Sequence, residues 1–245
     1  HFAARIEVGE SVRDPGAFFD NNVAGAIKAG AVITDVGSVK GAVVEQVAKL
    51  APPQAFFVPG HPIAGTEFSG PEAGFASLFE NRWLILTPLD DLRPEYARAV
   101  AMLEAFWRAL GANVEHMRPE RHDLVLAMTS HLPHLIAFSI VVTAEDLQNV
   151  KEAEIVRYSA GGFRDFTRIA ASDPTMWRDV FLNNREAVLE VLGHFVEELT
   201  ALQKAVRWGD AQKLFDTVTR ARRVRKEVIE AGQDIAAPNF GRDKV

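Results

Sequence analysis

Short apolar runs that alternate with helical patterns constrain the fold of the first half of the chain most strongly. β-Branched or aromatic runs occur at residues 31–34, 56–58, 83–86 and 113–117. Between them, apolar residues at helical spacing fill 43–50 and 96–110, and a short helix fits 71–79. This alternation is typical of crossover units on a mostly parallel sheet. We therefore predict an α/β domain over residues 1–118.

The strand patterns stop after Pro119. Apolar periodicity predicts helices over residues 120–145, 149–160, 174–207 and 210–231. A region of alternating strands and helices followed by helices alone indicates two domains. We place the all-α domain at residues 119–245.

Composition excludes several classes of protein. The sequence has no cysteine, which rules out disulfide scaffolds, thiolate metal sites and a cysteine nucleophile. A formal net charge of −6 argues against nucleic acid as the main partner. We identify no apolar run of the length that a membrane span needs and no signal peptide. These features predict a cytoplasmic protein without a nucleic-acid or membrane partner.

Ser38 and His61 follow the first two predicted strands, where ligands bind in open α/β sheets. A serine beside a histidine suggests nucleophilic catalysis, although no G-x-S-x-G elbow is present. Alternatively, His61 accepts a proton and the Ser38 hydroxyl fixes its tautomer. A third reading makes Ser38 a helix cap and His61 a residue of a surface turn. Spacing alone leaves these readings open.

Two histidines lie three residues apart in an apolar helical segment. His131 and His134 share a helical face with Pro133 between them. The pair could bind a metal ion, but no third ligand at matching spacing is evident. The other reading is a core helix kinked at the proline, with both rings hydrogen-bonded to backbone.

Arginines beside a glycine pair form a third candidate site. Arg164 and Arg168 follow Gly161-Gly162, and a guanidinium matches a carboxylate with two hydrogen bonds. Asp165 would then hold an arginine in place or gate the entrance. The alternative is a loop between helices closed by a local ion pair.

Four motifs occur together in one order: DVGSVK at 35–40, GHPIAGTE at 60–67, SHLPH at 130–134 and GFRDFTR at 162–168. Asp173-Pro174 and Trp177 follow them. The series resembles the prephenate/arogenate (cyclohexadienyl) dehydrogenase family of tyrosine biosynthesis, from about residue 31 to about residue 225. The resemblance implies a Rossmann-like dinucleotide-binding domain followed by a helical dimerisation domain, and hence a homodimer.

The resemblance also implies a reaction. Prephenate or arogenate is oxidised by hydride transfer to NAD or NADP and decarboxylated, which gives 4-hydroxyphenylpyruvate or tyrosine. By resemblance His61 accepts the hydroxyl proton. Ser38 orients His61 and lies beside the nicotinamide. Arg168 holds the ring carboxylate. The other residues implied at the substrate are Asp165, His131, Thr66, Glu67 and Trp177, of which Trp177 reaches the partner subunit's site. Those implied at the cofactor are Asp35, Gly37 and Ser38, and no metal is implied.

One feature departs from the family pattern. Members carry a G-x-G-x-x-G phosphate loop upstream of the DVGS turn, and residues 1–34 contain no G-x-G. We therefore predict a dinucleotide-binding domain that lacks its N-terminal part. No residue distinguishes prephenate from arogenate or NAD from NADP. The alternatives to a dehydrogenase are a hydrolase using Ser38, His61 and the His131/His134 pair, and a non-catalytic dimeric binding module.

Overall fold

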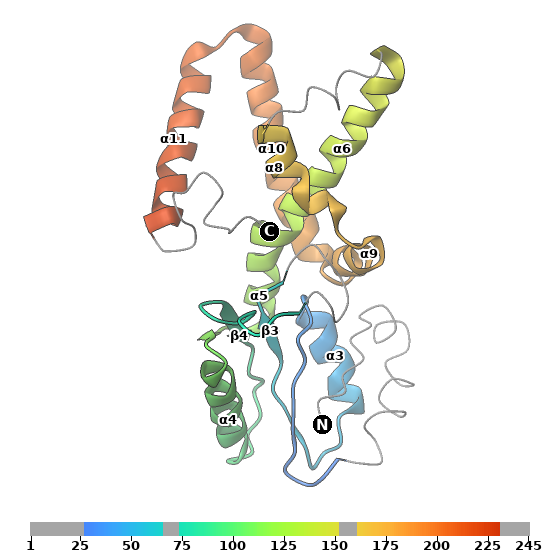
Figure 1. Ribbon diagram of the computed structural model, residues 1–245, viewed down its shortest axis with the longest axis vertical. Helices are drawn as coiled ribbons and strands as arrows, with labels where there is room; N and C mark the ends of the chain where they lie inside the picture. Colours follow the sequence, from blue (N-terminus) through green and yellow to red (C-terminus); the bar gives the residue numbers. More distant parts are fainter. Residues whose placement is uncertain (1–26, 66–73, 152–160, 231–245) are drawn as a thin grey trace. The chain divides into compact units, whose positions relative to one another are not determined.

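The computed structural model describes residues 27–65, 74–151 and 161–230 (Figure 1). The chain divides into two compact units, residues 1–191 and 192–245. The strands are β1 (Val32–Ile33), β2 (Phe56–Phe57), β3 (Gly60–Pro62), β4 (Trp83–Leu86) and β5 (Asn113–His116). The helices up to residue 151 are α3 (Gly41–Leu50), α4 (Tyr96–Ala109), α5 (Pro119–Leu126) and α6 (Leu132–Lys151). Those that follow are α8 (Gly161–Thr167), α9 (Pro174–Asn183), α10 (Arg185–Trp208) and α11 (Ala211–Glu230).

The predicted order of an α/β region followed by helices is confirmed. Among the described residues, β1 pairs with β2 in parallel, and β4 pairs with β5 in parallel. The remaining pairing, between β3 and β4, is antiparallel. The boundary near residue 118 lies between β5 and α5, and it stays a prediction because the compact units divide elsewhere.

The turn expected after the second strand is a strand of its own. Gly60, His61 and Pro62 form β3, in which His61 lies opposite Ile85 of β4. Proline is tolerated there because it ends the strand, where no ladder bond from its nitrogen is needed. The short helix expected over 71–79 is wrong for its described part, since residues 74–79 contain no helix and residues 76–81 form turns. His61 is therefore held by strand pairing rather than by a loop.

The α/β core lies between the strands and α4 (Figure 1). Leu84 and Leu86 of β4 are fully buried and pack with Leu103 and Trp107 of α4. Gly111 ends this helix at φ +85°, and a Cβ there would meet Glu80 at 3.1 Å. Glycine is required at that turn by both conformation and space. The packing fixes β4, and through it the neighbouring strand β3.

The helical region differs from the sequence expectation in detail. The helix predicted over 120–145 contains a π-helical turn at Ala127–His131, and α6 continues without the predicted break to residue 151. The predicted helix over 174–207 divides at Asn184 into α9 and α10. Residues 161–167, one reading of which was a loop, form helix α8. A π-turn inserts one extra residue and re-aims side chains, and such turns are frequent at functional sites.

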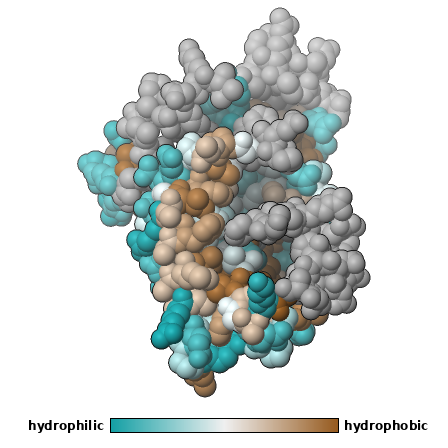
Figure 2. Space-filling model, turned by 60° about the horizontal axis from the view of Figure 1, so that its bottom comes forward, coloured by the Kyte–Doolittle hydropathy of each residue, from teal (hydrophilic) through white to brown (hydrophobic). Residues whose placement is uncertain are grey.

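One helical stretch of the described chain, Pro119–Leu147, has the length and composition of a membrane span, with a mean hydropathy of 1.7. The expectation that no segment has the length and composition of a membrane span was therefore wrong. The stretch also contains His122, Asp123 and His131, which are buried and hydrogen-bonded within the chain. Figure 2 shows one face of the molecule, on which apolar residues lie beside hydrophilic ones.

Candidate active site

The loop between β1 and α3 is fixed by Asp35. Its Oδ2 accepts a hydrogen bond from the backbone N–H of Gly37 at 2.9 Å. Its Oδ1 accepts one from the backbone N–H of Gly60 at 3.1 Å. Because Gly60 begins β3, this one carboxylate ties the DVGS turn to the strand that carries His61.

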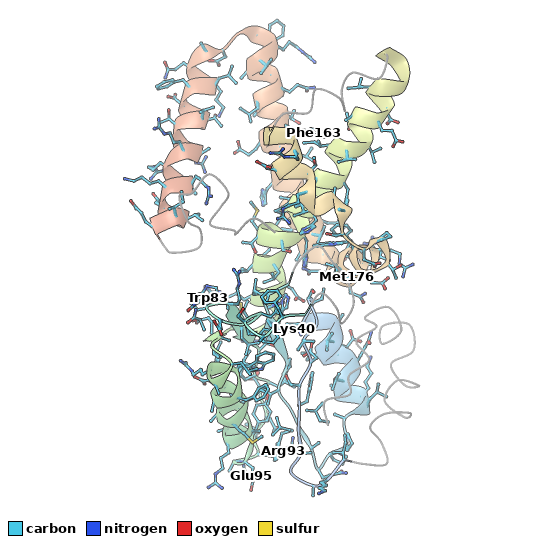
Figure 3. All side chains as sticks on the ribbon, in the orientation of Figure 1. Lys40, Trp83, Arg93, Glu95, Phe163 and Met176 are labelled. Carbon is cyan, nitrogen blue, oxygen red and sulfur yellow. The ribbon has the colours of Figure 1, made fainter. Side chains whose placement is uncertain are left out.

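Lys40 completes this link from the start of α3 (Figure 3). Its side chain is fully buried, forms an ion pair with Asp35 and donates from Nζ to the carbonyl oxygen of Gly60 at 2.8 Å. Burial lowers the pKa of Lys40, and the Asp35 carboxylate opposes that shift. A buried ammonium without such partners would be strongly destabilising. Lys40 therefore acts as an internal tie beneath the site.

His61 lies at one end of a chain of hydrogen-bonded side chains. Its Nδ1 is 2.8 Å from Nε2 of His122, and Nδ1 of His122 is 2.8 Å from Oδ1 of Asp123. The two imidazole rings are 5.0 Å apart, with 61° between their planes. His61 and His122 are both buried. No hydrogen bond joins Ser38 to His61 among the described residues, so His122 occupies the position expected for the serine.

Asp123 also caps helix α3 from a distance. Its two carboxylate oxygens accept the backbone N–H groups of Lys40 and Gly41, each at 2.8 Å. The expected cap, Ser38, lies outside the helix, which begins at Gly41 and has no cap from its own segment. The free N–H groups of a helix start need an acceptor, and a carboxylate there also interacts favourably with the helix dipole.

Burial and neighbouring charges shift the pKa values of these groups. Burial lowers the pKa of His61 well below 6.5, and electrostatic interactions with His122, Lys40 and His131 lower it further. Burial of Asp123 acts to raise its pKa, yet the hydrogen bonds from His122, Lys40 and Gly41 hold it below its usual value. At neutral pH the site therefore holds a neutral imidazole at 61 and a carboxylate at 123.

The two histidines of the SHLPH motif have separate partners. His131 is buried, and its Nδ1 lies 3.0 Å from Nδ2 of Asn184, which also donates to the backbone carbonyl of Asp123 at 2.8 Å. Burial lowers the pKa of His131 to about 4. His134 stacks on the ring of Trp177 at 3.7 Å and bonds to the carbonyl of Ser130 at 2.8 Å. In the part of the chain that the structure describes, no three acidic or histidine side chains gather as metal ligands.

The remaining candidates of the helical region are more dispersed. Arg168 begins the 3₁₀ turn after α8 and lowers the pKa of His134 through its charge, although burial is the largest cause. Asp165 is exposed and lies 3.4 Å from Nε of Arg164. Trp177 is buried against Val39 and Val180 of the same chain, so its reach into a partner subunit stays a prediction. Thr66 and Glu67 lie outside the described residues.

A cleft lies between the start of α3 and helix α9. Gly37, Ser38 and Val39 line one side, and Asp179 and Asn183 line the other. Oδ1 of Asp179 accepts a hydrogen bond from Arg178 at 2.7 Å. Its Oδ2 is buried without a hydrogen-bond partner among the described residues. A buried carboxylate oxygen in this state is suited to accept an N–H from a ligand.

Four residues of this network were missed by the sequence analysis: Lys40, His122, Asp123 and Asn184. Lys40 lies inside the DVGSVK motif, five positions after Asp35, and this spacing of opposite charges was the available signal. His122-Asp123 is a histidine beside an acid on a helix start, a pair too common to single out. For Asn184 no signal was available, because it acts only through residues that are distant in sequence.

An α/β region followed by helices, with a buried histidine beside the turn after β1, fits a nucleotide-binding dehydrogenase. Residues 20–116 match the family model described as the nucleotide-binding domain of prephenate dehydrogenase, and residues 118–220 match its dimerization domain. The chain belongs to the prephenate dehydrogenase family.

Similar proteins agree with this assignment. The chain is 41% identical over 203 residues to a cyclohexadienyl dehydrogenase of Zymomonas mobilis, covering 83% of this chain and 68% of that protein. It is 39% identical over 184 residues to a prephenate dehydrogenase of Bacillus subtilis, covering 75% of this chain and 48% of that protein. A crystal structure of Aquifex aeolicus prephenate dehydrogenase with hydroxyphenyl propionate and NAD+ gives a TM-score of 0.79 at 36% identity. That match covers 89% of this chain and 73% of the other.

Proposed function

We propose that this chain carries the active site of an enzyme that oxidises and decarboxylates prephenate, arogenate or both with NAD(P)+. The observation that carries the proposal is His61, a buried imidazole kept neutral beside the DVGS turn. A neutral imidazole can take the proton of an alcohol while the carbon of that alcohol loses a hydride. Two matched family domains and relatives named for this chemistry support it.

His61 and Arg168 divide the work on the substrate. His61 Nε2 accepts the proton of the ring hydroxyl as the hydride leaves its carbon. Arg168 holds the ring carboxylate by charge and orients the ring. The electron pair of the bond to the departing CO2 then enters the ring, and the resulting phenolate oxygen takes back the proton from His61. Bound NAD(P)+ supplies the hydride acceptor.

The residues of the cleft fit the nicotinamide end of such a nucleotide. Asp179 Oδ2, buried without a partner among the described residues, would accept an N–H of a carboxamide. Gly37 and Ser38 lie across the cleft and lack bulky side chains, which leaves room for a flat ring to approach the backbone. Asp35 holds the turn in place through the backbone of Gly37.

We further propose that the enzyme is a homodimer formed by its helical region. Large apolar side chains are exposed on α6, α10 and α11, among them Val142, Leu199 and Phe215. Apolar surface of this kind usually marks an interface. A second copy of the helical region would cover it, as expected for a family whose second domain is described as a dimerization domain.

Absorbance of the reduced nicotinamide tests the proposed activity. The purified protein is given prephenate or arogenate, each with NAD+ and with NADP+. We expect reduced nicotinamide and CO2 in equal amounts with at least one pair. Absence of turnover with all four pairs, from a folded protein that binds nucleotide, would favour the non-catalytic module instead.

Replacing Arg168 tests the carboxylate site. Arg168→Ala should raise KM for the substrate by about 10- to 100-fold, because a charge-assisted hydrogen-bond pair is lost. Steady-state kinetics measure this change. The matched control is Arg164→Ala, whose side chain is exposed and pairs with Asp165 within the described part of the chain. Equal effects of the two substitutions would move the carboxylate away from Arg168.

A further inference from the structure

The ionised carboxylate of Asp123 determines which nitrogen is the donor in each of the two hydrogen bonds that lead through His122 to His61. Oδ1 of Asp123 already accepts the backbone N–H of Lys40 and lies 2.8 Å from Nδ1 of His122. An ionised carboxylate has lone pairs and no hydrogen, so it can only accept. Nδ1 of His122 must therefore carry the hydrogen of that bond.

The position of the hydrogen on His122 in turn determines the position of the hydrogen on His61. A neutral imidazole has one N–H, so a ring that donates from Nδ1 can only accept at Nε2. Nε2 of His122 lies 2.8 Å from Nδ1 of His61, which must then be the donor. The hydrogen of His61 is placed on Nδ1, and Nε2 keeps its lone pair.

We propose that His122 and Asp123 are positioning residues that hold His61 in the tautomer whose Nε2 can accept the substrate's proton. The catalytic meaning of this inference rests on the proposed function, whereas the tautomer itself does not. His122 touches neither substrate nor cofactor in this scheme and acts only through His61. Nε2 of His61 makes no hydrogen bond to another described residue, so its lone pair has no partner among them.

Burial makes this choice of tautomer stringent. The side chain of His122 is fully buried, and His61 is 8% exposed. Were His61 to carry its hydrogen on Nε2, two lone pairs would face each other at Nδ1 and at Nε2 of His122. An unmade hydrogen bond between buried groups is costly, and water has little access to replace it. With His122 neutral, the other tautomer is therefore disfavoured in the free enzyme.

The hydrogen-bonded series of His61, His122 and Asp123 also accommodates the proton that the reaction produces. When Nε2 of His61 takes a proton, its Nδ1–H can move to Nε2 of His122, so the two rings share one positive charge. Asp123 is the negative group beside that charge, whereas Lys40 and His131 are the other ionisable groups that act on His61. Without the Asp123 carboxylate, the protonated pair would lose the acid that is hydrogen-bonded to it.

Nitrogen NMR of the complete protein tests the tautomer directly. With 15N-labelled histidine, the His61 ring should show a protonated Nδ1 and an unprotonated Nε2 at pH 7.5, assigned by comparison with His61→Asn. Finding the hydrogen on Nε2 of His61 would overturn the proposal, because it would require a doubly protonated His122. This measurement needs no substrate and holds whether or not the proposed reaction is correct.

Two substitutions of His122 test its effect on the reaction. His122→Phe removes the acceptor, and it should lower kcat on the order of 10- to 100-fold while changing KM less than threefold, as for outer partners of functional histidines. His122→Gln restores an acceptor oxygen for Nδ1 of His61, and it should recover most of the loss together with the tautomer. His194→Gln, an exposed histidine, is the control and should change neither.

The outcomes separate the two proposals. An inactive wild-type protein with the expected tautomer would contradict the proposed function alone. An active wild type whose kcat is unchanged in His122→Phe would contradict the positioning role alone. Where His122→Phe does not fold, as judged by circular dichroism, the Gln variant and the wild-type spectrum still decide.

Discussion

Two regions of the chain differ in whether their side chains find partners within one copy of the protein. The polar junction, formed by Asp35, Lys40, His61, His122 and Asp123, hides charged and polar groups that are all hydrogen-bonded within one chain. The open helical faces are the exposed apolar side chains of α6, α10 and α11. The polar junction is complete in one copy, whereas the open helical faces leave surface that a partner would cover.

The partners in the polar junction lie far apart in sequence. His61 and His122 are separated by 61 positions, and Lys40 and Asp123 by 83. The open helical faces are instead local: along α10, Leu189, Val196, Leu199 and Val206 recur at the spacing of a helix seam. The polar junction therefore depends on tertiary contacts, whereas the open helical faces depend on a pattern repeated along one helix.

The largest effect is expected at the reactive end of the polar junction. His61→Asn removes the proton acceptor but keeps a side chain that can donate to His122. Turnover should fall by roughly 10²- to 10⁴-fold, the usual contribution of a general base, with KM nearly unchanged. Stopped-flow absorbance of reduced nicotinamide measures it. A kcat within threefold of wild type would remove His61 from the proton transfer.

The next largest effect is expected at Asp123, which caps helix α3 from a distant part of the sequence. Asp123→Ala leaves two backbone N–H groups of α3 and the ring N–H of His122 without their acceptor. We expect a loss of about 3 to 5 kcal/mol in the free energy of unfolding, because a lost cap costs about 1 kcal/mol and each unpaired buried donor costs more. Urea denaturation followed by circular dichroism measures this loss.

The matched control is Asp173→Ala. Asp173 caps α9 through a single bond from the backbone N–H of Met176 at 2.7 Å, and it is exposed. Its removal should cost only about 1 kcal/mol. Similar losses for the two substitutions would mean that burial and distant partners add nothing to the stabilisation by a helix cap. The polar junction would then be no more dependent on tertiary contacts than a local cap.

The pH dependence of stability tests the buried histidines. His131 has its pKa lowered from 6.5 to about 4. Above pH 6.5 neither the folded nor the unfolded ring binds a proton, so its contribution to stability is fully present. Between pH 6.5 and 4 only the unfolded state binds one, and about 3 kcal/mol of unfolding free energy is lost. His61, with its pKa also lowered, acts in the same direction.

Urea titrations at several pH values measure this dependence. His131→Gln should reduce the loss of unfolding free energy below pH 6.5 by the amount that His131 contributes. This holds whatever the substitution does to the stability at pH 7.5. His194→Gln is the control because that ring is exposed on α10. An unchanged slope in the His131 variant would show that the ring is protonated in the folded protein.

Which of these features sequence could predict depends on the range of the interactions. The strands at 83–86 and 113–116 and helix α4 follow from local apolar patterns, and the structure has them at the predicted places. The reading that made Ser38 the cap of this helix was wrong, since α3 begins at Gly41 and its cap comes from Asp123, more than eighty residues later. The antiparallel strand β3 was missed because its pairing with β4 has no local signature.

The candidate site shows the same division. His61 stood out because it follows a strand and because its motif resembles a known family. Its hydrogen-bond partner was expected to be Ser38, the nearest polar side chain by sequence reasoning, and it is His122 instead. Proximity in a fold is set by packing of whole elements, here α5 against the start of α3, and a single sequence does not encode that packing visibly.

The smallest effect on the single chain is expected on the open helical faces. Leu199 is 52% exposed on α10, so Leu199→Lys should change the unfolding free energy of the isolated chain by no more than about 0.5 kcal/mol. The same substitution should shift the proposed dimer toward monomers in sedimentation velocity, because a charge would be buried at the interface. Glu198→Lys, a neighbouring exposed position, should leave the assembly intact. A large loss of stability in monomeric Leu199→Lys would mean that this face is already covered within one chain, and the contrast with the polar junction would no longer hold.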